Sequence, residues 1–231
     1  MQGDSAIIFG ASGGIGGALV KELSFSPQYS RVEALSRHSA PAVDLLSESS
    51  IVTAASILAA DGISPSLIIV ATGILHKDRK GPEKSLRELD PEWMVENYRL
   101  NAIGPALIAK HFLPLMPRDR RICLAILSAR VGSISDNRLG GWHSYRASKA
   151  ALNMLVRNIS IEWQRKNPQA IIVGLHPGTV ETELSGPFKG NPAHERFTPS
   201  LAARQLLDVL EGLNPEQSGL LFAYDGTVIA P

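Results

Sequence analysis

The stretch SAIIFGASGGIG, residues 5–16, runs from an apolar segment through a glycine-rich turn into a helical pattern. The apolar segment predicts a buried strand over 5–9, and the periodicity after the turn predicts a helix over 15–24. Glycine permits a tight turn and a close approach of phosphate to the backbone, and a helix N-terminus presents free N–H groups to an anion. This order indicates a dinucleotide-binding site formed by Gly10, Ser12, Gly13, Gly14, Ile15 and Gly16.

Short apolar runs alternate with longer helical patterns along the rest of the chain. Further strands are predicted at 32–36, 41–44, 67–71, 121–127, 170–175 and 219–223, and helices at 47–60, 91–113, 144–166 and 199–212. Residues 67–70 are apolar at every position, as in parallel strands buried on both faces. The alternation predicts an α/β fold of the doubly wound, Rossmann-like type, with a parallel sheet between two helical layers. We expect one domain over residues 1–231.

The composition bears on which partners and which compartment to expect for the protein. The chain has 231 residues, 44% hydrophobic and 19% charged, with a formal net charge of +1, so charge gives no reason to expect a nucleic-acid or membrane partner. No run approaches the ~18 apolar residues of a membrane helix, and the N-terminus lacks a signal-peptide pattern. The single cysteine, Cys123, lies in an apolar run and is expected to be a core residue. A chain that cannot form an internal disulfide fits a reducing compartment, so we expect a cytoplasmic protein.

The end of the second predicted strand bears on the choice of cofactor. An acidic residue there would bind the ribose 2′-hydroxyl of NAD, but the chain reads Ser36-Arg37-His38, and Glu33 lies too early. Arg37 can pair with the 2′-phosphate of NADP, and Ser36 can add a hydrogen bond. NADP(H) is therefore the expected cofactor, with NAD(H) as the alternative.

Tyr145 and Lys149 lie one turn apart on the predicted helix 144–166, on the same face. An ammonium near a phenol favours the phenolate and lowers the tyrosine pKa. A tyrosine tuned in this way can give a proton to a carbonyl oxygen or take one from an alcohol. The pair therefore predicts an acid–base site.

The glycine spacing at 10, 14 and 16, together with Tyr-x-x-x-Ser-Lys-Ala-Ala at 145–151, resembles the short-chain dehydrogenase/reductase family. The resemblance covers nearly the whole chain in the correct order, although Phe9 stands where the family often has threonine. Residues 132–141 and 145–153 further resemble the branch that contains C-factor and sniffer-type carbonyl reductases.

The resemblance implies further cofactor contacts. An aspartate at the position of Asp44 contacts adenine in the family, the turn at 71–73 lies beside the cofactor, and the segment after the strand at 170–175 contacts nicotinamide and phosphate. Lysine holds the nicotinamide ribose. The residues implied in these roles are Asp44, Leu45, Ala71, Thr72, Gly73, Tyr145, Lys149, Pro177, Gly178, Val180 and Thr182.

The resemblance also implies a catalytic serine after the strand at 121–127, acting as an oxyanion-type donor. Counting back from Gly132 puts Ala129 in that place, so the chain departs from the pattern. Ser128 is the first candidate and Ser133 the second, and counting does not decide between them because a one-residue slip reverses a side chain in a strand. Asn101 is the expected fourth member, supporting the lysine. His176 is expected to be structural.

These expectations combine into an NADP(H)-dependent oxidoreductase that transfers hydride between nicotinamide and a carbonyl or alcohol substrate, with Tyr145 as general acid or base. The alternative is a nucleotide-binding signalling or sensing protein of the C-factor type with weak or no turnover, which Ala129 motivates. A homodimer or homotetramer through the helices 91–113 and 144–166 is implied, and no metal site is expected. The loop 185–199 is interpreted as a substrate lid. The candidate pocket residues are Trp142, His143, Leu184 and Phe188.

Overall fold

The computed structural model describes residues 4–78, 80–188 and 196–231. The strands are β1 Asp4–Phe9, β2 Tyr29–Leu35, β3 Leu67–Val70, β4 Ile122–Leu127, β5 Ala170–His176, β6 Leu221–Ala223 and β7 Val228–Ile229. The α-helices are α1 Gly14–Ser24, α2 Glu48–Ala60, α3 Pro91–Tyr98, α4 Gly104–Phe112, α5 His143–Gln164 and α6 Pro199–Gly212. Short 3₁₀ turns occupy Leu86–Glu88, Leu113–Leu115, Arg130–Gly132 and Pro215–Gln217, and a π-helical segment occupies Arg99–Ile103.

The strands form one sheet in the order β2-β1-β3-β4-β5-β6-β7. The first six strands in this order are parallel to one another, and β7 pairs antiparallel with β6. The chain turns to one side of β1 to make β2 and then crosses to the other side to make β3. This reversal opens a crevice at the carboxyl ends of β1 and β3, where ligands bind in folds of this kind.

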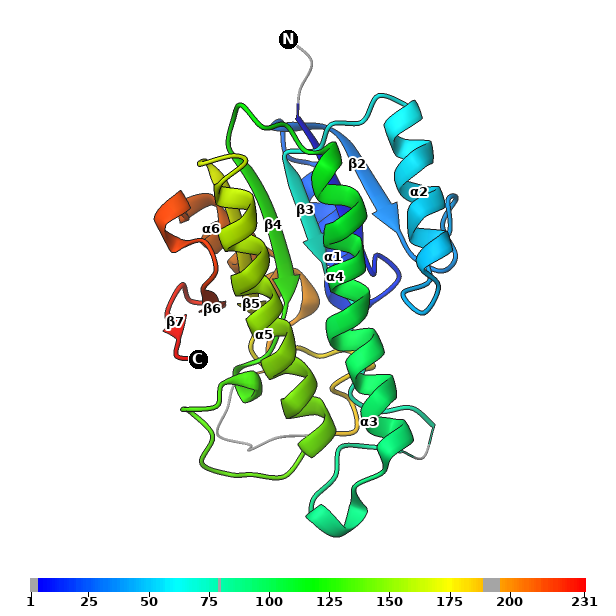
Figure 1. Ribbon diagram of the computed structural model, residues 1–231, viewed down its shortest axis with the longest axis vertical. Helices are drawn as coiled ribbons and strands as arrows, with labels where there is room; N and C mark the ends of the chain where they lie inside the picture. The colour runs from blue at the N-terminus through cyan, green and yellow to red at the C-terminus, as the bar shows by residue number, and fades with distance from the viewer. Residues whose placement is uncertain (1–3, 79, 189–195) are drawn as a thin grey trace.

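Helices cover both faces of the sheet, as the sequence predicts. One core joins Ile7 and Phe9 of β1 to α2, α4 and α5, and the other joins Ala6 and Ile8 to α1 and α6. Figure 1 shows α4 and α5 crossing in front of the sheet. All four residues of β3 are buried, which matches its uninterrupted apolar sequence. The doubly wound, three-layer architecture is thereby confirmed.

The strand predicted at 41–44 is wrong. Pro41 has no N–H to donate, the Val43 N–H donates to the Ser36 carbonyl at 2.8 Å, and the Asp44 N–H donates to Ser50 Oγ at 2.9 Å. Local turns and a side chain therefore satisfy this backbone, and no ladder forms. Val43 is apolar because it packs into the core, where it is 5% exposed.

The helix predicted at 91–113 is interrupted. The π-helical turn Arg99–Ile103 separates α3 from α4, and Leu113 already belongs to a 3₁₀ turn. Strand β7 is absent from the predicted strands, because its two residues are too few to show a period.

Cys123 is buried in the core, and burial raises the pKa of its thiol to about 12, so the prediction of an inert core residue is confirmed. Among the described residues, no helix combines the length and the apolar character needed to cross a membrane.

Candidate active site

The glycine-rich turn between β1 and α1 lines a cleft of about 1360 Å³ at the carboxyl edge of the sheet. A Cβ on Gly10 would lie 2.8 Å from the Ala71 carbonyl oxygen, and one on Gly16 would lie 2.1 Å from the Gly10 oxygen. Helix α1 begins at Gly14 without a side-chain cap and without an acidic residue in its first turn. Among the described residues no side chain caps its first N–H groups, which fits the pyrophosphate of a dinucleotide.

Ser36 and Arg37 line the cleft beside the end of β2. Arg37 is exposed, and within the described part of the chain it has no ion-pair partner. Glu33 does not line the cleft. Its carboxylate forms an ion pair with Arg31, with a distance of 2.5 Å to Arg31 Nε. This end of the cleft thus offers a guanidinium and no carboxylate at the carboxyl end of β2.

The next wall of the cleft comes from Asp44, Leu45 and the turn after β3. Thr72 lies in that turn, and its Oγ1 is buried without a hydrogen-bond partner among the described residues. A buried hydroxyl normally has a partner, so this atom is available to a ligand. Gly73 follows, and a Cβ there would come 3.2 Å from Asn101 Oδ1.

The segment after β5 closes over the glycine-rich turn. Gly178 has a φ of 74°, and a Cβ there would lie 2.7 Å from the Phe197 ring. A Cβ on Gly14 would lie 2.8 Å from Thr182 Cγ2, so Thr182 touches the turn directly. Pro177, Gly178, Val180 and Thr182 all line the cleft, as does Thr179.

Tyr145 and Lys149 line the cleft from one face of α5. Lys149 Nζ donates to the Leu127 carbonyl at 2.9 Å and lies 5.9 Å from the centroid of the Tyr145 ring. Burial lowers the pKa of Lys149 to about 7 and raises the pKa of Tyr145 to about 12. The predicted lowering of the phenol pKa is therefore corrected: desolvation of both groups outweighs their mutual attraction in this structure.

Asn101 lies behind the cleft, fully buried in the π-helical turn between α3 and α4. Its Oδ1 accepts from the Ile74 N–H at 2.8 Å, and its Nδ2 donates to the Ile74 carbonyl at 2.9 Å and to Ser148 Oγ at 3.1 Å. The residue thereby ties the segment after β3 to α5. A π-helical turn widens the helix locally and is often found at functional sites.

The two candidate serines occupy different surroundings. Ser128 lines the cleft, and its Oγ donates to Asn153 Oδ1 at 2.6 Å. Ser133 is not among the lining residues: its hydroxyl accepts from the Asp136 N–H at 3.1 Å and donates to the Pro231 oxygen at 3.4 Å. Ala129 shares an apolar cluster with Tyr145.

An aromatic wall flanks Tyr145. The Trp142 ring lies 6.2 Å from the Tyr145 ring and 5.6 Å from the Phe188 ring. Trp142, Leu184 and Phe188 line the cleft as predicted, whereas His143 does not. Phe188 belongs to the predicted lid 185–199, of which residues 189–195 lie outside the described residues.

Most of the predicted site residues therefore meet in one cleft, with Gly16 and Asn101 packed behind it. His176 also lines it, and burial, followed by the nearby Arg130, lowers the pKa of its imidazole to about 4. Sequence reasoning missed Leu75, which packs against Tyr145, and Asn153, the partner of Ser128. Asn153 is two turns beyond Tyr145 on the same helical face, and this spacing is the signal that could have identified it.

A family model described as enoyl-(acyl carrier protein) reductase matches residues 21–209 of the chain. The chain belongs to the short-chain dehydrogenase/reductase family, a class of oxidoreductases that transfer hydride with a nicotinamide cofactor and act on small molecules.

Two relatives are similar over much of the chain. The C-signal protein of Myxococcus xanthus is 37% identical over 146 residues, which cover 63% of this chain and 82% of that protein. The 1-hydroxy-2-glutathionyl-2-methyl-3-butene dehydrogenase of Rhodococcus sp. (strain AD45) is 32% identical over 189 residues, covering 82% of this chain and 78% of that protein.

Solved structures agree with the fold. An NADPH-bound carbonyl reductase from chicken fatty liver superposes with a TM-score of 0.85 at 26% identity, covering 100% of this chain and 95% of that one. The carbonyl reductase Sniffer of D. melanogaster gives a TM-score of 0.84 at 23% identity, covering 99% and 100%. The second likeness shows a shared fold.

Proposed function

We propose that the protein is an NADP(H)-dependent oxidoreductase that interconverts a carbonyl and an alcohol, with Tyr145 transferring the proton. The observation that carries the proposal is the placement of Tyr145 and Lys149 in the same cleft as the glycine-rich turn. A proton-transfer group and an anion cradle in one cleft are what a hydride-transfer enzyme needs on the protein side.

The bound nicotinamide would supply the hydride. The residues of the chain would supply the rest: the glycine-rich turn and Thr182 would hold the pyrophosphate, and Lys149 would hold the ribose. Because burial raises the pKa of Tyr145 to about 12, its phenol carries its proton at neutral pH. A protonated phenol suits the reduction of a carbonyl, in which Tyr145 Oη donates to the oxygen as it gains charge.

Ser128 is the proposed second donor to the substrate oxygen. Its single hydroxyl hydrogen points to Asn153 Oδ1 in this structure. A half-turn of the Asn153 amide would let Nδ2 donate to Ser128 Oγ and would free that hydrogen for the substrate. Asn153 would then orient Ser128, while Ala129 contributes only a methyl group next to Tyr145.

Arg37 supports the choice of NADP(H) over NAD(H). It is a guanidinium beside the end of β2 with no ion-pair partner among the described residues, and Ser36-Arg37-His38 contains no carboxylate that would bind a 2′-hydroxyl. The similar chicken protein is described as NADPH-bound. The geometry and the likeness both support the phosphorylated cofactor in this proposal.

The test is a Tyr145→Phe variant assayed by NADPH oxidation against a panel of aldehydes and ketones. Loss of the proton donor is expected to lower kcat about 10²–10⁴-fold. The Kd for NADPH, measured by fluorescence titration, is expected to stay within about threefold, because the glycine-rich turn is untouched. A variant that keeps wild-type kcat would refute the role of Tyr145.

A second candidate function is a nucleotide-binding signalling protein with little turnover. Ala129 beside Tyr145, in place of the family serine, favours it, and the C-signal protein is among the similar relatives. Tight NADPH binding with no turnover of any carbonyl would support this reading. Turnover that falls on Ser128→Ala would reject it.

We also propose a homodimer or homotetramer that uses the outer faces of α3, α4 and α5. Val95 and Met154 are exposed there by 51% and 62%. Apolar side chains at these positions gain from being covered by another subunit.

A further inference from the structure

Helix α5, which carries Tyr145, begins without a cap from its own residues. Trp142 occupies the N-cap position in the left-handed conformation, with φ 52° and ψ 41°, and makes no side-chain capping bond. The first turn of α5 contains no acidic residue. A helix that starts in this way leaves several N–H groups for partners elsewhere in the chain.

Glu83 provides those partners from 61 residues earlier in the chain. One carboxylate oxygen accepts from the Ser144 N–H at 3.1 Å, and the other accepts from the Ser144 hydroxyl. The backbone oxygen of Glu83 accepts from the Trp142 N–H at 2.5 Å. Glu83 is only 3% exposed, so a carboxylate inside the protein meets the positive end of the α5 dipole.

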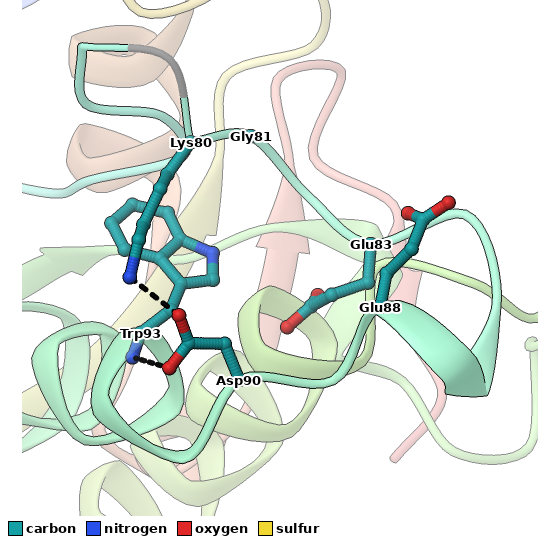
Figure 2. Close-up of a pocket in the computed structure, with 6 residues that line it drawn as sticks. All are labelled: Lys80, Gly81, Glu83, Glu88, Asp90 and Trp93. Atoms are coloured by element: carbon teal, nitrogen blue, oxygen red, sulfur yellow. Dashed lines mark hydrogen bonds and ion pairs between the residues drawn. The ribbon is translucent and has the colours of Figure 1, made fainter.

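The segment that carries Glu83 is itself fixed to α3. Figure 2 shows Lys80 paired with Asp90 and Asp90 accepting from the Trp93 N–H, at 2.5 and 3.3 Å. The carboxylates of Glu83 and Glu88 point away from each other in this view. Glu88 accepts from the Lys84 N–H at 2.8 Å and remains exposed, so it does not reach α5.

The contacts of Glu83 end directly at the candidate active site. Ser144 is the residue before Tyr145, and Trp142 is the residue whose ring packs at 6.2 Å from Tyr145. The start of α5 therefore contacts the buried carboxylate of Glu83, and the aromatic wall contacts the backbone oxygen of the same residue. A shift of about 1 Å in a reacting group can cost about 10²-fold in rate, which makes such an anchor consequential.

We propose that Glu83 is a positioning residue: it fixes the N-terminus of α5 and thereby sets where the Tyr145 hydroxyl and the Trp142 ring meet the substrate. This inference rests on the proposed role of Tyr145. Glu83 lies on a loop outside the cleft, so it would affect the reaction only through the position of α5.

The experiment compares Glu83→Ala, Glu83→Gln and Ser144→Ala with Glu88→Gln, a matched control on the same loop. Glu83→Ala is expected to lower kcat about 10–100-fold while the Kd for NADPH changes less than about twofold. Glu83→Gln keeps an oxygen for the Ser144 N–H and should restore much of kcat, and Ser144→Ala should fall in between. Glu88→Gln should match the wild type.

Two further readouts separate positioning from general damage. Hydride transfer should become more rate-limiting in Glu83→Ala, so the primary isotope effect with deuterated NADPH should rise. Amide hydrogen exchange of Ser144, whose N–H donates to the Glu83 carboxylate, should accelerate, while that of β4 stays unchanged. If Glu83→Ala does not fold, Glu83→Gln and Ser144→Ala decide the outcome.

Wild-type kcat in the folded variants, or equal losses of kcat and cofactor affinity, would overturn the inference. A wild-type protein with no turnover would instead overturn the proposed function. In that case the exchange of the α5 amides still tests the anchor: unchanged exchange in Glu83→Ala would show that Glu83 does not fix the helix.

Discussion

Lys149 lies inside the protein, where its ammonium donates to the carbonyl oxygen of Leu127. Burial lowers its pKa from an ordinary 10.5 to about 7. Between these values the unfolded chain holds a proton that the folded protein has released, so the free energy of unfolding should rise with pH. We expect this contribution to approach about 1.4 kcal/mol per pH unit in protein without cofactor.

The control for this expectation is Lys149→Met, which has a similar length and does not titrate. Urea denaturation at a series of pH values gives the free energy of unfolding of both proteins. The free energy of unfolding of the wild type should rise relative to that of the variant as pH rises from 7 towards 10.5. Parallel pH dependences for the two proteins would show that Lys149 keeps its ordinary pKa.

Substitutions of the two candidate serines are expected to differ in their effect on kcat. Removing an oxyanion-type donor costs about 10²–10³-fold in kcat, so Ser128→Ala should show a loss of that size. Ser133→Ala should stay within about twofold, because the Ser133 hydroxyl is bonded to Asp136 and Pro231. Steady-state kinetics on one carbonyl substrate compares them. A larger loss in Ser133→Ala would reverse the assignment.

Residues close in sequence were the ones that sequence reasoning could place. Tyr145 and Lys149 share a helical period, and the glycine-rich turn carries its own conformational signature. Glu83 was out of reach, because its partner Ser144 is 61 residues away and no local pattern joins them. Ser128 and Ser133 could not be separated by counting, since the side chain direction depends on where β4 ends.

At the scale of elements, the strongly periodic segments were predicted and the transitions between them were not. The strand predicted at 41–44 failed because Val43 is buried through a turn that bonds to Ser36. Within the predicted helix 91–113, α3 and α4 follow one another along the chain, but the π-helical turn Arg99–Ile103 between them interrupts the α-helical hydrogen bonding. Apolar periodicity reports burial and carries little information about such a local change in pitch.

The π-helical turn is expected to contribute to the free energy of unfolding, because it places Asn101 against Ile74 and Ser148. Asn101→Ala would leave the Ile74 N–H and carbonyl, which are partly buried, without these partners. A buried group left unsatisfied costs about 1–3 kcal/mol, and partial exposure puts these two groups at the lower end, so we expect a loss of about 2 kcal/mol in the free energy of unfolding. Urea denaturation measures it.

Asn158→Ala is the matched control, since Asn158 is exposed on α5. An exposed substitution of this kind should change the free energy of unfolding by less than about 0.5 kcal/mol. Equal effects of the two substitutions would mean that the bonds of Asn101 to Ile74 add nothing to stability and that the turn is held by packing alone.

At the scale of the whole molecule, one cleft joins both helical layers, from Arg37 beside β2 to Tyr145 on α5. A cofactor that spans it should stabilise the entire fold, by about 2.7 kcal/mol at a concentration of 100 times its Kd. For a protein of this size that corresponds to a rise in Tm of about 5–10 °C. Thermal denaturation with NADPH and with NADH at equal concentration should show the larger rise for NADPH.

Arg37→Ala should remove that difference, because an exposed guanidinium facing a phosphate contributes about tenfold in affinity. The rise in Tm with NADH should stay as in the wild type, since the other proposed cofactor contacts, from the glycine-rich turn to Thr182, would be the same for both dinucleotides. Arg138→Ala, a substitution of another arginine that lines the cleft, serves as the control for general loss of positive charge. If Arg37→Ala and Arg138→Ala lower the NADPH response equally, the preference arises from the overall charge of the cleft, and Arg37 has no specific contact with the 2′-phosphate.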